Sequence, residues 1–142
     1  MISVKHSALF DDVLKEFNYD YGSVFVFDGY VISEINQGIT FTWEHHAKQI
    51  VEDVTSFLET DGNDIIYISH RINSYAVKPN DWLKFFTHSY SLKGYGVVGY
   101  TQGSLLNTMI ENLFFSKKIK RFNSLDAAVQ WATNKVLADM EH

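Results

Sequence analysis

The residues best suited to binding chemistry follow a short apolar run near the middle of the chain. They are Arg71, Asn73, Ser74 and Tyr75. The planar guanidinium of an arginine donates paired hydrogen bonds to a carboxylate or a phosphate. Phosphorylation of a hydroxyl at Ser74 or Tyr75 would add about −1.5 to −2 charge and could recruit or release a partner. Ser74 is therefore a candidate phosphorylation site, and the alternative is that these hydroxyls only satisfy the backbone of a turn.

A second polar stretch joins this set if the strands before both stretches are parallel. Gln102 and Ser104 follow the apolar run 94–100, and Gly103-Ser104 leads into a helix start whose free N–H groups can bind an anion. In open α/β sheets, ligands bind at the carboxyl ends of parallel strands. Two structural alternatives stay open: Arg71 pairs with Glu34 of a neighbouring strand, and Ser104 only caps its helix.

Catalytic and metal-binding signatures are not evident in the sequence. His45 and His46 are adjacent on a predicted helix, so their side chains diverge by about 100° and cannot share one ion. There is no cysteine, no nucleophile elbow, no phosphate loop and no dinucleotide fingerprint. We predict no metal site, no cofactor and no enzymatic activity. A hydrolase using His70 or His88 would require a polarising carboxylate within about 3 Å of the imidazole.

Composition restricts the class of protein. A chain of 142 residues has the length of one domain. The net charge of −5 argues against nucleic-acid binding, which requires a basic face. The N-terminus has no signal-peptide pattern, and no apolar run reaches the roughly 18 residues of a membrane span. We therefore expect a cytoplasmic protein.

Phe, Tyr and Trp together form 15% of the residues, which is a high proportion. The simplest interpretation is a bulky core, because each aromatic side chain buries a large area. The alternative is an exposed aromatic patch for a partner, with Trp82, Phe85 and Trp131 as its candidates.

The N-terminal third predicts an antiparallel hairpin. Residues 23–27 and 30–36 are rich in β-branched and aromatic residues, and Asp28-Gly29 between them is a hairpin signal in which both turn positions need φ > 0. Residues 13–18 fit a short strand, although their spacing also fits a helix.

Helices and strands then alternate along the rest of the chain. Thr42 can cap a helix to Leu58, which residues 60–63 should end with a left-handed residue. The remaining elements are a strand at 65–68, a helix opened by Pro79, a strand at 94–100, a helix from Ser104, a strand at 118–122 and a helix from Ser124. This order predicts an α/β fold with a mixed sheet, an antiparallel hairpin followed by parallel strands, and about four flanking helices. The basic run 117–121 favours an edge strand whose lysines prevent aggregation, and the alternative is contact with an acidic partner or a membrane surface.

Several runs carry a resemblance to a known family. The runs are YISHRINSY, VKPNDWLKFF, ENLFF and RFNSLDAAVQWA, together with SEINQGITFTWE after the hairpin. Their order and spacing resemble the SpoIIAA-like branch of the STAS domain superfamily. The resemblance implies a mixed sheet with flanking helices, and residues 1–142 as a single STAS-like domain.

The resemblance also implies a kind of function. Better-understood relatives bind a kinase-like partner and are switched by phosphorylation of a serine that follows an aspartate. Residues 70–76 read HRINSYA and contain no such Asp-Ser pair. We therefore expect a regulatory or protein-binding module, with a small-molecule or lipid carrier as the alternative and a homodimer left open. The expected binding rim consists of Arg71, Asn73, Ser74, Tyr75, Gln102 and Ser104.

Overall fold

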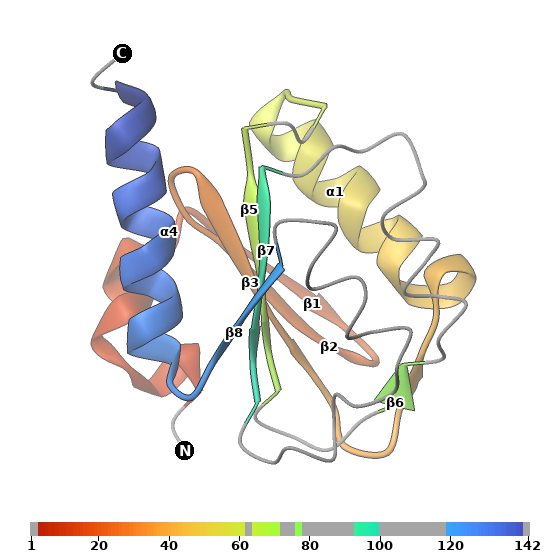
Figure 1. The fold of residues 1–142 in the computed structure, drawn as a ribbon. Helices are drawn as coiled ribbons and strands as arrows, with labels where there is room; N and C mark the ends of the chain where they lie inside the picture. The colour runs from red at the N-terminus through yellow and green to blue at the C-terminus, as the bar shows by residue number, and fades with distance from the viewer. Residues whose placement is uncertain (1–2, 62–63, 72–75, 78–92, 100–118, 141–142) are drawn as a thin grey trace.

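The computed structural model describes residues 3–61, 64–71, 76–77, 93–99 and 119–140. They form a six-stranded sheet in the order β1-β2-β3-β5-β7-β8. Helix α1 covers one face of this sheet, and helix α4 with the N-terminal turns covers the other (Figure 1). The strands are β1 (Lys15–Tyr19), β2 (Gly22–Val26), β3 (Tyr30–Ile35), β5 (Ile66–His70), β7 (Gly94–Val98) and β8 (Ile119–Phe122).

Strand directions confirm the mixed sheet. β1, β2 and β3 are antiparallel neighbours, whereas β3, β5, β7 and β8 run parallel to one another. Strands β4 (Thr40–Phe41) and β6 (Ala76–Val77) form a separate parallel pair. Within the described residues there are two α-helices, both at predicted places. The two other predicted helices, opened by Pro79 and by Ser104, lie outside the described residues.

The hairpin between β2 and β3 is confirmed, but its turn differs from the prediction. Phe27 N donates to Tyr30 O at 2.8 Å, which closes a tight turn around Asp28-Gly29. Only Gly29 has a positive φ, of 86°, and Asp28 does not. The expectation that both turn positions need a positive φ was therefore wrong, because one left-handed residue suffices to reverse this chain.

The N-terminal segment ends in a strand. Two short 3-10 helices come first, η1 (Val4–His6) and η2 (Ala8–Asp12), with the side chains of Ser3 and Ser7 as their N-caps. β1 then pairs with β2 from residue 15 onward. The predicted strand at residues 13–18 is confirmed from residue 15 onward. The spacing fits a helix and a strand equally well, and the pairing with β2 decides for the strand.

Helix α1 (Lys48–Leu58) continues from a π-helical turn, η3 (Trp43–Ala47). Thr42 Oγ1 accepts a hydrogen bond from His45 N at 3.2 Å, so the predicted cap is confirmed. The helix ends at Glu59, which has φ 54° and ψ 50°. The left-handed residue therefore precedes the predicted stretch 60–63, and it is not a glycine.

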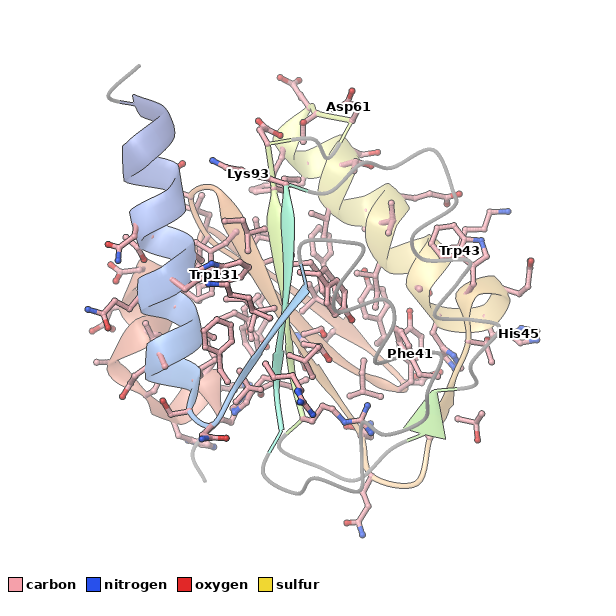
Figure 2. The ribbon with its side chains drawn as sticks, viewed as in Figure 1. Phe41, Trp43, His45, Asp61, Lys93 and Trp131 are labelled. Carbon is pink, nitrogen blue, oxygen red and sulfur yellow. The ribbon has the colours of Figure 1, made fainter. Side chains whose placement is uncertain are left out.

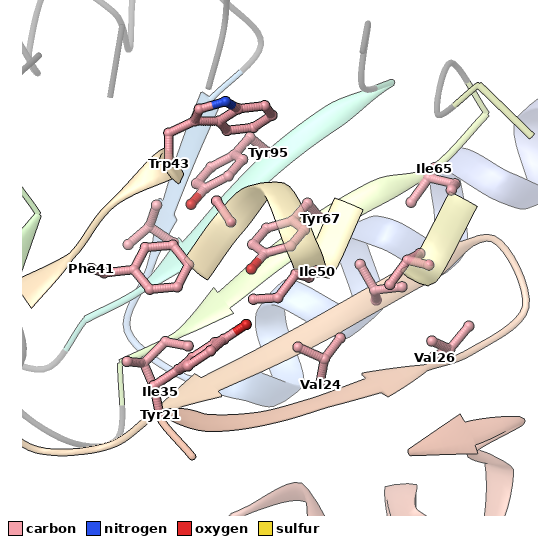
Figure 3. Packing of buried hydrophobic residues seen from close by; sticks show 14 residues of the cluster. Tyr21, Val24, Val26, Ile35, Phe41, Trp43, Ile50, Ile65, Tyr67 and Tyr95 are labelled. Carbon is pink, nitrogen blue, oxygen red and sulfur yellow. The ribbon is translucent and has the colours of Figure 1, made fainter. Parts of the chain in front are cut away.

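Each face of the sheet has its own apolar core. Below α1, the rings of Tyr67 and Tyr95 stack at 5.2 Å, and Ile50 and Val54 of the helix pack into the same cluster (Figure 3). The opposite core joins Val4 to β2, β3, β5, β7 and α4 through the buried residues Phe25, Phe27, Tyr30, Ile32, Ile66, Ile68, Val98, Leu125, Ala128 and Ala132. Aromatic side chains thus contribute to both cores, as the composition predicted.

Helix α4 (Leu125–Met140) seats one large side chain against two glycines of β7. Ser124 Oγ accepts from Ala127 N at 3.2 Å and caps the helix as predicted. Trp131 extends from α4 toward the sheet (Figure 2). A Cβ at Gly94 or Gly96 would lie 3.1 or 3.2 Å from the indole ring. Trp131 is therefore half-buried and packs against the sheet, so it is not part of an exposed patch. Trp82 and Phe85 lie outside the described residues. Neither described helix is long and apolar enough to cross a bilayer.

Candidate functional site

Of the predicted binding rim, the structure describes Arg71 alone. Asn73, Ser74, Tyr75, Gln102 and Ser104 lie outside the described residues. Arg71 directly follows β5, and its backbone N–H donates to Val98 O of β7 at 2.9 Å. The residue is only 7% exposed. Arg71 is therefore at the predicted end of the sheet, but as a buried residue and not as an exposed cation.

A buried acid–histidine pair lies at the same end of the sheet. Ser33 and Ser69 form the last registered pair of β3 and β5, so the next residues, Glu34 and His70, lie opposite each other on the α4 face. His70 Nδ1 is 2.8 Å from Glu34 Oε2, and the two side chains are 0% and 9% exposed. A carboxylate only accepts, so the imidazole Nδ1–H is the donor.

The N-terminal segment closes over this pair. The Ser3 hydroxyl donates to Glu34 Oε1, and Val4 N donates to Glu34 Oε2 at 2.9 Å. Val4 is itself completely buried in the core on the α4 face. One carboxylate therefore joins the N-terminal turn to β3 and β5, and we call Ser3, Val4, Glu34 and His70 the carboxylate clamp.

Opposing effects act on the ionisation of Glu34. Burial by itself raises its pKa, whereas the hydrogen bonds from His70, Ser3 and Val4 and the charge of His70 lower it. The pKa is lowered below the ordinary value of 4.5, because the three donors outweigh the desolvation. The carboxylate is consequently ionised at neutral pH inside the protein.

The clamp replaces one of the structural alternatives from the sequence. Glu34 was expected as a partner of Arg71, but its oxygens instead accept from His70, Ser3 and Val4. Side chains alternate along a strand, so consecutive residues such as His70 and Arg71 are directed to opposite faces. His70, and not Arg71, is therefore the partner of Glu34.

Among the described residues, the clamp meets one condition for a hydrolase. A carboxylate lies 2.8 Å from His70, as a polarised histidine would need. However, His70 is completely buried, and Ser3 donates to the carboxylate and not to the imidazole. A nucleophile must share a hydrogen bond with its base. In the described part of the chain, the hydrogen bonds of the clamp connect the N-terminal turn to β3 and β5.

The second candidate surface is the outer edge of β1. β1 is a terminal strand of the sheet, and in the described part of the chain it pairs with β2 only. Leu14 and Phe57, 56% and 43% exposed, are the exposed large hydrophobic residues of the described structure. Phe57 meets the ring of Phe17 edge-on at 6.3 Å. We call β1 with Leu14 and Phe57 the β1 edge surface.

Hydrogen bonding across β2 shows which backbone groups of β1 point outward. Asn36 N donates to Tyr21 O and Phe27 N to Tyr30 O, both at 2.8 Å, so odd-numbered β2 residues bond to β3. In an antiparallel strand, alternate residues bond to opposite neighbours. Even-numbered residues such as Val26 therefore bond to β1.

The register then assigns the two sides of β1. Lys15, Phe17 and Tyr19 face even-numbered residues of β2, so they bond inward. Glu16 and Asn18 consequently direct their N–H and C=O groups away from the sheet. These outward backbone groups are what an added strand would bind.

Charges on the β1 edge surface already have partners within the chain. The Lys15 ammonium lies 5.5 Å from the centre of the Phe17 ring, and Glu16 pairs with Lys5 at 3.8 Å. The Tyr19 hydroxyl donates to Asp53 of α1 at 2.6 Å. Burial and the neighbouring Asp53 carboxylate raise the pKa of Tyr19. The surface is therefore close to neutral in charge.

The opposite edge of the sheet has a different character. Among the described strands, β8 is the other terminal one, as the basic run 117–121 predicted, and its Lys120 and Arg121 are exposed. Like charges along a strand oppose edge-to-edge pairing. The sheet therefore has one charged edge, and one edge flanked by aromatic residues.

His46 has structural surroundings. His46 Nδ1 accepts from Thr42 N at 2.9 Å, and its ring stacks on Phe41 at 5.3 Å. Across residues 3–61 and the other described ranges, no group of three or more metal-ligating side chains occurs.

Sequence reasoning missed both the clamp and the outward-facing residues of β1. Glu34 and His70 each end an apolar strand pattern, and two polar residues at equivalent places on adjacent parallel strands were the available signal. No local signal distinguishes the outer side of β1 from its inner side. A scan against protein families and searches of curated proteins and of solved structures found no match, so the STAS resemblance stays a prediction.

Proposed function

We propose that this chain is a non-enzymatic, STAS-like regulatory module that binds another polypeptide along the β1 edge surface. The observation that carries the proposal is the edge itself. Glu16 and Asn18 direct backbone donors and acceptors outward beside two exposed apolar side chains, Leu14 and Phe57. Proteins that accept an added strand use this combination, in which main-chain hydrogen bonds give affinity and flanking side chains give selectivity.

The chemistry of the clamp supports a binding role over a catalytic one. Its carboxylate accepts three hydrogen bonds from within the chain, and its histidine is fully buried. These groups hold the N-terminal turn in place and occupy no part of the outer side of β1. The rim residues Ser74, Tyr75, Gln102 and Ser104 are proposed as a further contact region, with Ser74 as a modification site.

The carrier alternative has less support. A ligand pocket would occupy about 300 Å³ or more. In the described part of the chain, the space between the sheet and α1 is occupied by packed side chains such as Tyr67, Tyr95, Ile50 and Trp43 (Figure 3). Native mass spectrometry of the purified protein distinguishes the two, since a carrier would retain a small molecule.

Site-specific photocrosslinking tests the binding surface. A benzophenone amino acid replaces Asn18 on β1 in one variant and the exposed Gln130 on α4 in a control variant. Both variants are expressed in the cells from which the protein comes and then irradiated. We expect a polypeptide adduct at position 18 and none at position 130. Absence of any adduct at position 18, or equal adducts at both positions, contradicts the proposal.

A further inference from the structure

We infer that the polypeptide bound by the β1 edge surface is a second copy of this chain, paired antiparallel about a twofold axis through Phe17. The inference rests on the proposed function and names its partner. It joins two six-stranded sheets into one continuous sheet. Closed twofold dimers are the commonest form of protein oligomer.

Symmetry limits the registers that two copies of β1 can adopt. Antiparallel strands related by a twofold axis keep their faces on the same side, so opposed residues must point the same way. One residue of β1 must therefore lie directly opposite its own copy, with the axis midway between the two, and we name each register by that residue. Only Glu16, Phe17 and Asn18 are central enough in the five-residue strand to be that residue.

Charge selects one of these three registers. An axis at Glu16 opposes this carboxylate to its own copy, and an axis at Asn18 opposes Glu16 to Asp20. Like charges directly opposite each other destabilise a strand pair. An axis at Phe17 opposes Glu16 to the amide of Asn18 and opposes no like charges, so it is the favoured register.

The same register satisfies the outward backbone groups. Glu16 and Asn18 are the residues whose N–H and C=O groups point away from β2, and with the axis at Phe17 each faces the other across the interface. Such hydrogen-bonded pairs exchange two bonds each, which gives about four new bonds for the dimer.

Side chains on the α1 face also match in this register. Phe17 meets its own copy as a non-hydrogen-bonded pair, the closer of the two pair types, with Cα atoms about 4.5 Å apart. Lys15 faces Tyr19 of the second copy, a cation opposite an aromatic ring. Phe57, which already contacts Phe17, extends the apolar contact on both sides of the axis.

The other sheet edge excludes the same arrangement. An axis at Lys120 or at Arg121 opposes a basic side chain to its own copy. Self-pairing through β8 is therefore repulsive in the registers centred on these residues. This asymmetry makes β1 the edge for self-association.

Proline substitution on the outward side of β1 tests the dimer. Asn18→Pro removes an N–H that points away from β2, and proline is tolerated on an edge strand. The matched control Asn18→Ala loses the same side-chain contact with Ser23 but keeps the N–H. In analytical ultracentrifugation we expect a dimer for the wild type and Asn18→Ala, and a folded monomer for Asn18→Pro. A wild type that is monomeric at about 100 µM, far above the dissociation constants of stable dimers, overturns the inference, as does a dimeric Asn18→Pro.

Cysteine substitution tests the register without depending on the proline variant. The chain has no cysteine, so a single introduced thiol can pair only with its own copy. Phe17→Cys places the two thiols opposite each other, whereas Lys15→Cys separates them by roughly 13 Å, beyond the reach of a disulfide. We expect oxidation to give a covalent dimer for Phe17→Cys only. Equal or greater crosslinking of Lys15→Cys overturns the register.

The inference and the proposed function fail in different ways. If the photocrosslinker at position 18 captures a different protein while the purified chain is monomeric, the second copy is wrong and the binding surface stands. If position 18 captures no polypeptide in cells, the proposed function itself fails.

Discussion

His70 Nδ1 lies 2.8 Å from Glu34 Oε2 in the interior, where the two side chains are 0% and 9% exposed. The pair links two adjacent parallel strands, and through Ser3 and Val4 it also holds the N-terminal turn. Burying an ionised group is costly unless hydrogen bonds satisfy it. Removing one member of the clamp therefore leaves a buried polar group without its hydrogen-bond partner.

Removing the carboxylate should destabilise the protein strongly. We expect Glu34→Ala to lower the free energy of unfolding by about 3–5 kcal/mol, because it leaves buried donors without their acceptor. Urea denaturation measures the change. Glu16→Ala is the matched control, because its pair with the 58% exposed Lys5 lies at the surface and should contribute at most about 1 kcal/mol. Similar losses for the two variants would contradict the assigned role of the clamp.

Acid should weaken the clamp. The pKa of Glu34 is lower in the folded protein than the ordinary value of 4.5. Its contribution to stability is therefore complete above pH 4.5 and is lost as the pH falls through the lower, folded pKa. In denaturation curves from pH 7 to pH 2, the difference between wild type and Glu34→Gln should shrink below pH 4.5. A difference that stays constant over this range would show that the clamp does not titrate as described.

Gly22 should tolerate no side chain. A Cβ at this position would lie 2.4 Å from the backbone oxygen of Glu34 and 2.9 Å from Ile35 Cα. We expect Gly22→Ala to cost about 2 kcal/mol or more, because backbone on both strands must shift. Gly38→Ala is the control, since Gly38 has a positive φ of 82° and a Cβ added there would meet no atom within 4 Å. Its cost should be the smaller, about 1 kcal/mol, from backbone conformation alone. The reverse order in thermal unfolding would refute the close approach of β2 to β3.

Gly96 and Trp131 should be energetically coupled. A Cβ at Gly96 would lie 3.2 Å from the indole and 3.3 Å from the Phe122 ring. Overpacking of this kind costs about 1–3 kcal/mol. We expect Gly96→Ala to be clearly less destabilising when Trp131→Leu has already removed the ring. A double-mutant cycle measures this coupling, and additive effects would show that α4 does not seat Trp131 on β7.

Local patterns in the sequence were sufficient for most of the described elements. Alternating β-branched and aromatic residues around Asp28-Gly29 predicted the hairpin, and the 3.6-residue spacing after Thr42 predicted α1 with its cap. The last helix followed in the same way from Ser124. These features depend on neighbours within a few residues, so the sequence determines them directly.

The details of the turns were less predictable. The αL residue that ends α1 is Glu59, although a glycine follows nearby in the chain. The turn at Asp28 needs only one positive φ. Tertiary packing sets where a helix must stop and how a hairpin twists, and it overrides local preference at single residues.

By itself, the sequence determined an α/β chain with a mixed sheet, an antiparallel start and a basic edge strand. Only the tertiary structure decided that Glu34 binds His70 and not Arg71. It alone also decided that the backbone N–H and C=O groups of Glu16 and Asn18 point away from the sheet. Local periodicity tells which residues alternate, because alternation follows from backbone geometry. It does not tell which strand lies beside which, because that choice depends on contacts between residues far apart in the chain.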